Sequence, residues 1–280
     1  MARMILASLS GLSSDHTVLD TAIAAAHIDG GHVLALRTRI DVVDVAAAAS
    51  IGLPRPGLGI SDSIVRIREE ERVRARHARG AYDEARSRHG IDAGSPVTLA
   101  WEETASLSDT LLARARYHDL TVMGRDEELS PERIRTVLLT SGRPLLLAPP
   151  RAPSLLGKTV AIAWKEGAEA ARAITAAEPL LARAERIFIL AAPDRSGAQD
   201  QTAGSVARLA EHLTGKGFKT EIRLTEPGGG PHAIRNLAYE CDADLLVMGA
   251  YAHSRVREML LGGMTEAMLA DCAIPVFLFH

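Results

Sequence analysis

Short apolar runs alternate with amphipathic segments along the chain. In the second half the apolar runs lie at about 158–164, 186–192, 219–225, 244–249 and 275–279. Between two of them, Val206, Leu209 and Leu213 recur at intervals of three and four residues, which is typical of one face of a helix. Pro231 suits the first turn of a further helix. Strands that alternate with helices in this way predict an α/β fold, with a parallel sheet covered by helices on both faces.

The apolar pattern occurs twice. Residues 119–125 read Asp-Leu-Thr-Val-Met-Gly-Arg, and residues 244–250 read Asp-Leu-Leu-Val-Met-Gly-Ala. Opening runs at 5–9 and 160–164, and closing runs at 144–148 and 275–279, repeat in the same order. A proline-rich stretch at 149–153 separates the copies and reads as a linker. The sequence therefore predicts two tandem Rossmann-like domains, at 1–150 and 154–280, each with a five-stranded, mainly parallel sheet.

The first half is longer before its Met-Gly run. The opening runs are 155 residues apart and the Met-Gly runs 125, so the first half has about 30 additional residues. We expect residues 40–60, which are rich in proline and glycine near their end, to form a surface excursion that leads into a long polar helix. Residues 66–88 contain eight arginines and five acidic residues above an apolar face, which indicates a solvated helix rather than a nucleic-acid patch.

The composition and charge of the chain argue against some classes of function. The net charge is −3, the aromatic content is 4%, and no apolar run approaches the roughly 20 residues of a membrane-spanning helix. Neither nucleic acid nor a membrane is therefore indicated as a partner. The two cysteines, Cys241 and Cys272, lie in apolar or alanine-rich surroundings and are expected to be reduced, which weakly favours a cytoplasmic protein. No common catalytic or metal-binding motif occurs, so we predict no catalytic and no metal-ligating residue.

The segment with the most candidate ligand-binding residues begins at Gly249 and ends at Thr265. It leaves a predicted strand and leads through Gly262 and Gly263 into a predicted helix. The N-terminus of a helix presents free N–H groups and a partial positive charge, and both favour a phosphate. The segment is therefore the candidate anion site.

This segment resembles the binding loop of the universal stress protein family. Nucleotide-binding members carry Gly, two residues, Gly, nine residues, Gly and then Ser or Thr. Gly249 and Gly262 match the first and third glycines, whereas Ala252 replaces the second. Gly263 stands at the Ser/Thr position, and Thr265 supplies a hydroxyl two residues later. The resemblance covers nearly the whole chain as two copies, but the loop match is partial.

Another departure follows the first strand of each copy. The family has an acidic residue there that faces the nucleotide, and the matching residues are Ser10 and Lys165. A lysine could meet a phosphate in place of a ribose hydroxyl. In the first half, acidic residues at 126–128 stand where a phosphate would want N–H groups, so we expect that half to have lost its phosphate site.

By this resemblance the chain is expected to be a stress-associated cytoplasmic binding protein rather than an enzyme. The second half would bind ATP, AMP or a similar small anion, with Mg²⁺ accompanying ATP. The candidate binding residues are Trp164, Lys165, Met248, Gly249, His253, Ser254, Gly262, Gly263, Met264 and Thr265. Two alternatives stay open: an interaction module that binds no nucleotide and retains remnant loops, and a weak nucleotide hydrolase.

The resemblance also predicts how the two halves associate. Domains of this family dimerise through their last strands, and a tandem chain can make that pair internally. We therefore expect residues 144–148 to pair with residues 275–279 across a pseudo-twofold axis. Whether two chains associate further as a homodimer stays open.

Overall fold

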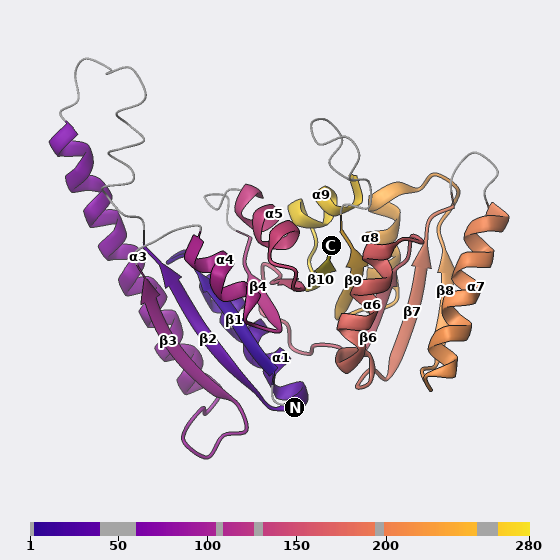
Figure 1. Ribbon diagram of the computed structural model, residues 1–280, viewed down its shortest axis with the longest axis horizontal. Coiled ribbons are helices and arrows are strands. Elements are labelled where there is room, and N and C mark those ends of the chain that lie inside the picture. The colour runs from indigo at the N-terminus through magenta and orange to yellow at the C-terminus, as the bar shows by residue number, and fades with distance from the viewer. Residues whose placement is uncertain (1–2, 40–59, 105–108, 126–130, 194–198, 251–262) are drawn as a thin grey trace.

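The computed structural model describes residues 3–39, 60–104, 109–125, 131–193, 199–250 and 263–280. Within these ranges, ten strands form one continuous sheet in the order β3-β2-β1-β4-β5-β10-β9-β6-β7-β8 (Figure 1). The strands are β1 (Arg3–Leu9), β2 (Gly31–Thr38), β3 (Thr98–Thr104), β4 (Leu120–Met123), β5 (Leu145–Leu147), β6 (Thr159–Ala163), β7 (Arg186–Ala191), β8 (Thr220–Leu224), β9 (Leu245–Gly249) and β10 (Val276–Phe279).

Each half contributes five of these strands, in the same internal order and all parallel to one another. The halves meet at β5 and β10, which pair antiparallel, with Leu146 opposite Phe277. Both of these side chains are fully buried. The prediction that the last strands pair is confirmed, and the pairing makes one sheet of the two halves.

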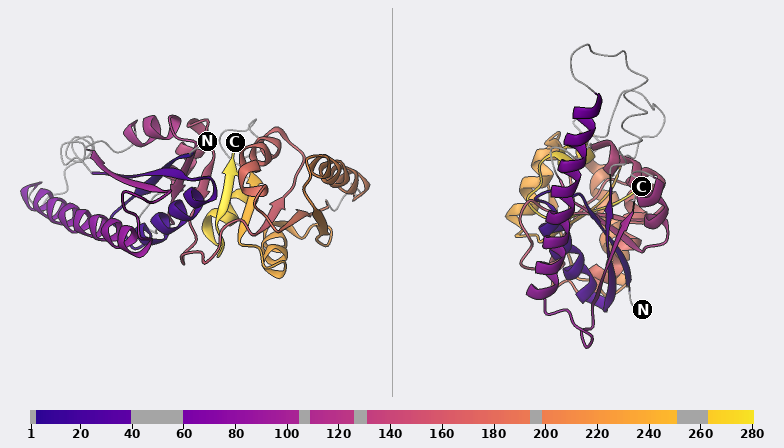
Figure 2. Two further views of the ribbon diagram at one scale, coloured as in Figure 1. Left: turned by 90° about the horizontal axis from the view of Figure 1, so that it is seen from below. Right: turned by 90° about the vertical axis from the view of Figure 1, so that its left-hand side faces the viewer.

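Helices cover both faces of the sheet (Figure 2). One face carries α1 (Asp15–Asp29), α3 (Ile60–Arg88), α6 (Ala168–Leu181) and α7 (Gln199–Gly215). The other face carries α4 (Asp109–Arg116), α5 (Pro131–Thr140), α8 (Gly230–Glu240) and α9 (Gly263–Ala270). Each face encloses one apolar core, which extends across both halves. The predicted α/β fold is therefore confirmed.

The aspartate at the start of the repeated segment connects the beginning of the fourth strand of each half to the beginning of the first strand by hydrogen bonds. Asp244 accepts hydrogen bonds from the N–H groups of Gly157, Lys158 and Thr159 at 2.7, 3.0 and 3.2 Å. In the first half the carboxylate of Asp119 accepts a bond from the N–H of Met4 at 3.0 Å. The repeated aspartate therefore has a structural role at the start of each half-sheet.

The long polar helix predicted for the first half is α3. Its inner face consists of buried Ala78, Ala81, Tyr82 and Ala85, as the sequence predicts. The excursion predicted for residues 40–60 lies, apart from residue 60, outside the described residues. Arg37 of β2 is buried and donates to Glu71 of α3 at 2.8 Å, so an ion pair secures this helix against the sheet.

Cys241 and Cys272 are free thiols and are both buried. Among the helices of the described ranges, none is long and apolar enough to cross a membrane.

Candidate functional site

The candidate site lies at the carboxyl ends of β6 and β9. These neighbouring strands are the first and fourth of the second half, and the chain order of the sheet reverses between them. In parallel α/β sheets, ligands bind at such a switch point. Ala163 lies opposite Met248 in the register, so Trp164 and Gly249 come next along the two strands. The structure therefore brings together the predicted residues that follow β6 and those that end β9.

Gly249 is in close contact with the backbone of α6. A Cβ atom at this position would lie 2.4 Å from the backbone nitrogen of Ala170 and 2.7 Å from the carbonyl carbon of Glu169. A glycine is therefore required here for the packing of α6 on β9, independently of any ligand. Met248, which precedes it, points into the core and is only 4% exposed.

The residues after β6 differ in their environment. Trp164 is half-buried against the core, and its Nε1 donates to the Oγ of Ser205 on α7 at 2.8 Å. Its indole therefore packs on the face of the sheet opposite α9. Lys165 is exposed and follows directly at the carboxyl edge.

The first turn of α9 supplies Gly263, Met264 and Thr265. Gly263 is exposed, Met264 is half-buried, and Thr265 is only 2% exposed. Met268 and Leu269 pack into the core below and hold the helix against the sheet. Because α9 lies on the crossover from β9 to the parallel strand β10, it begins at the carboxyl edge of β9. The remaining predicted residues, His253, Ser254 and Gly262, lie outside the described residues.

In the first half, the segment between β1 and α1, which corresponds to the segment between β6 and α6, contains a carboxylate. Asp15, at the start of α1, is buried and accepts hydrogen bonds from the N–H groups of Ser10 and Gly11, both at 2.8 Å. Its Oδ1 also accepts a bond from the Ser10 hydroxyl at 3.1 Å. The N–H groups that follow β1 are thus occupied by an internal anion. The acidic residues at 126–128, on which the sequence prediction for this half depended, lie outside the described ranges.

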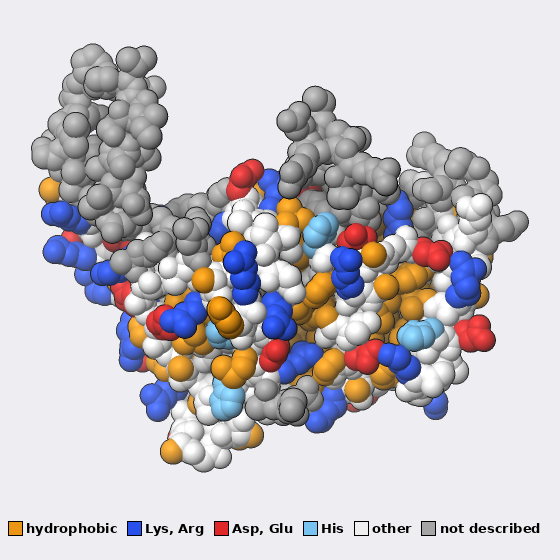
Figure 3. Space-filling view, in the orientation of Figure 1, with side chains coloured by type: hydrophobic (Ala, Val, Ile, Leu, Met, Phe, Trp, Pro, Cys, Tyr) orange, Lys and Arg blue, Asp and Glu red, His pale blue; other side chains and the backbone are white. Residues whose placement is uncertain are grey.

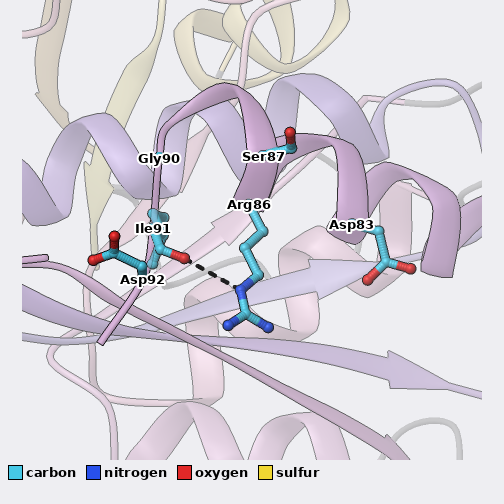
Figure 4. Close-up of a pocket in the computed structure, with 6 residues that line it drawn as sticks. All are labelled: Asp83, Arg86, Ser87, Gly90, Ile91 and Asp92. Carbon is cyan, nitrogen blue, oxygen red and sulfur yellow. Dashed lines mark hydrogen bonds between the residues drawn. The ribbon is translucent and has the colours of Figure 1, made fainter. Parts of the chain in front are cut away.

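A shallow depression of about 360 Å³ lies at the C-terminal end of α3 (Figure 4). It is lined by Asp83, Arg86, Ser87, Gly90, Ile91 and Asp92. Arg86 donates its Nε to the carbonyl of Ile91 at 3.2 Å, and Asp83 pairs with Arg79 at 3.2 Å. None of the predicted binding residues lines the depression, and we assign it no function. Within the described part of the chain, no group of three or more metal-ligating side chains comes together.

Sequence reasoning missed two arginines of the first half that contact the region of α9. Arg135 of α5 forms a bidentate ion pair with Glu266, which directly follows Thr265. Arg125, just beyond β4, donates to the carbonyl of Cys272, two residues after α9 ends. Both contacts join residues more than 130 positions apart. No local pattern of charge or hydrophobicity could have indicated them.

Comparisons with known proteins agree with this architecture. Residues 150–280 match the model of the universal stress protein family. A universal stress protein of Synechocystis sp. is 37% identical over 87 residues, a match that spans only 30% of either chain.

Among solved structures, a universal stress protein from Archaeoglobus fulgidus superposes with a TM-score of 0.69 at 16% identity, covering 99% of this chain and 96% of that one. A protein from Pseudomonas aeruginosa, described as functionally unknown, gives a TM-score of 0.60 at 17% identity and covers 99% of this chain and 92% of its own. These two likenesses show the fold over the full chain, and the family model shows the relationship of its second part. The second half of the chain therefore belongs to the universal stress protein family, and the chain as a whole has that family's fold in tandem.

Proposed function

We propose that this chain is a stress-associated binding protein whose second half holds an adenine nucleotide or a similar anion. The ligand phosphates would lie between Lys165 and the first turn of α9, where Thr265 supplies a hydroxyl and Gly263 and Met264 supply N–H groups. Mg²⁺ would accompany ATP, coordinated by the phosphates. The role is binding rather than catalysis.

One observation supports the proposal most directly. An exposed lysine follows β6 at the switch point of the half-sheet, and the eight-residue helix α9 begins at the same edge. A cation and a helix N-terminus together favour a phosphate more than either does alone, because the charge and the N–H donors act on the same oxygens. Figure 3 shows basic and acidic side chains interspersed over one face of the molecule, without a broad basic surface on that face that would suit a polyanion.

The first half is proposed to hold no phosphate. Asp15 occupies the N–H groups that follow β1, and its negative charge would repel a phosphate placed beside it. The two halves would then differ in function, with one nucleotide bound per chain.

The proposal is tested by calorimetric titration and by thermal shift with ATP, ADP and AMP, with and without Mg²⁺. Binding raises the melting temperature, because a ligand that prefers the native state stabilises it by mass action. Lys165→Ala and Thr265→Val should each weaken binding about tenfold or more, as expected for loss of a charge-assisted hydrogen bond. Ser10→Ala, at the position of the first half that matches Lys165, should leave the affinity unchanged. If no nucleotide binds the wild-type chain at millimolar concentration, the proposal is wrong.

A further inference from the structure

A carboxylate stands in the first turn of the proposed ligand helix. Glu266 of α9 directly follows Thr265. An acidic side chain at this position is attracted to the positive end of its own helix. It also repels any phosphate that approaches the same end, because like charges a few ångströms apart disfavour each other. The helix whose N-terminus is proposed to face the anion therefore carries, in its own first turn, a charge that would oppose one.

The first half supplies the counter-charge. Arg135 of α5 donates its Nε to one oxygen of Glu266 at 3.0 Å and its Nη2 to the other at 2.6 Å. The two helices lie side by side where the halves meet (Figure 1). A bidentate pair of this kind fixes the carboxylate in direction as well as neutralising it. Glu132 also lies near Arg135, at 3.7 Å, but is 82% exposed.

Both side chains of the Arg135–Glu266 pair are largely shielded from solvent. The side chains of Arg135 and Glu266 are only 20% and 28% exposed. Screening by salt and water is weaker for such a pair than for one on the open surface. The halves are already joined by β5 and β10, so the pair is not needed to hold them together.

We propose that Arg135 is a positioning residue for anion binding: it draws the Glu266 carboxylate aside and neutralises it, and so leaves the N-terminus of α9 available to a phosphate. This inference rests on the proposed function of the second half. It gives the first half a definite role, since a residue of the first half sets the charge at the site of the second. Binding would then depend on the tandem arrangement.

The charge argument predicts an asymmetry that a merely stabilising ion pair would not show. Arg135→Gln leaves Glu266 negative beside the ligand, so ATP should bind on the order of tenfold more weakly. Glu266→Gln removes the opposing charge, so ATP should bind as tightly as in the wild type or more tightly. The double variant should regain the wild-type affinity that the arginine substitution alone loses. If the pair served only to hold α9 in place, both single variants would weaken binding and the double variant would not recover.

A matched control is available at the other end of α9. Arg235 of α8 pairs with Asp271 at 2.5 Å, and the arginine is 16% exposed. Arg235→Gln removes another arginine–carboxylate pair, with a more exposed carboxylate (Asp271 is 79% exposed), and does so away from the first turn of α9. It should leave ATP affinity unchanged, because the lost charge lies away from the proposed phosphate position.

The experiment is calorimetric titration of the full chain with ATP at 20 °C, for the wild type, the three single variants and the double variant, at low and high salt. The expected result is weak binding by Arg135→Gln alone, with the difference from wild type shrinking at high salt. Equal affinities of wild type and Arg135→Gln overturn the inference and leave the proposed function intact. An Arg135→Gln variant that does not fold shifts the test to Glu266→Gln, where weakened binding overturns the inference. A wild-type chain that binds no ATP overturns both.

Discussion

Gly249 and Ala170 are in backbone contact: a Cβ atom at Gly249 would lie 2.4 Å from the nitrogen of Ala170. The corresponding glycine of the first half is also tightly packed, but against side chains: a Cβ at Gly124 would lie 2.4 Å from the Oγ of Ser14. The glycine of the repeated Met-Gly segment thus allows the first helix of each half to pack against the end of the fourth strand. This packing shapes the edge at which a ligand is proposed to bind.

Gly249→Ala should destabilise the protein even without any ligand. The methyl group would meet backbone atoms of α6, which cannot rotate away, so the helix must shift. We expect a loss of about 1–3 kcal/mol in the free energy of unfolding, measured by urea denaturation.

Gly263→Ala is the matched control for this substitution. Among the residues that the structure describes, a Cβ atom at Gly263 meets no atom within 4 Å, and alanine is a better helix former than glycine. Its stability should stay equal to the wild type or rise slightly. Equal stability of the Gly249→Ala variant and the wild type would contradict the packing role of Gly249.

Asp244→Ala should cost more stability than Asp119→Ala. Asp244 accepts bonds from three N–H groups and is half-buried, whereas Asp119 accepts one such bond from Met4 and is exposed. Loss of the acceptor leaves partly buried donors unsatisfied, at about 1–3 kcal/mol for Asp244 and under about 1 kcal/mol for Asp119. Urea denaturation of the two variants measures the difference. An equal loss in both would show that the number of bonds does not decide the effect.

The titration of Asp244 should contribute to the pH dependence of the free energy of unfolding. Burial raises the pKa of this carboxyl above the ordinary aspartate value, while the three N–H bonds and Lys158 act in the opposite direction. The folded state then holds the proton more tightly than the unfolded chain. The stability contributed by this group is therefore greatest at low pH and falls as the pH rises from about 3.9 through the raised pKa.

Asp244→Asn removes this titration. The difference in unfolding free energy between wild type and variant, followed from pH 3 to pH 7 in steps, should shift against the wild type as the pH rises. A flat difference would contradict the raised pKa.

The two halves should unfold as one unit. The chain contains only two tryptophans, Trp101 in the first half and Trp164 in the second, so each half has its own fluorescent reporter. Because β5 and β10 join both cores in one sheet, Trp101→Phe and Trp164→Phe variants should each give one transition in fluorescence and circular dichroism. Within each variant the midpoints of the two signals should coincide. An earlier transition reported by one tryptophan would show that the halves unfold independently.

The fold could be predicted from the sequence to a large extent, because its signals are local and repeated. The strands of the second half lie within one or two residues of the predicted limits, and the burial of Val206, Leu209 and Leu213 follows their helical spacing. The pairing of β5 with β10 is long-range, but it followed from the family resemblance. The polar face of α3 indicated an exposed helix because apolar positions occur on one side only.

The candidate site could be predicted only in part. Lys165, Gly249 and the first turn of α9 stand at one edge of the sheet because the strand order brings them there. The packing role of Gly249 was not predicted, since a sequence does not show how closely a helix approaches. Asp15 and Arg135 were missed for a related reason: their partners are set by tertiary geometry rather than by spacing along the chain.

The central claim is that the second half binds an adenine nucleotide and the first half does not. A crystal structure of the full chain grown with ATP and Mg²⁺ tests it most directly. The account predicts density for one nucleotide per chain, with its phosphates between Lys165 and the N–H groups of Gly263 and Met264, and none beside Asp15. A nucleotide bound beside Asp15, or a fully occupied structure with the phosphates away from α9, would contradict it.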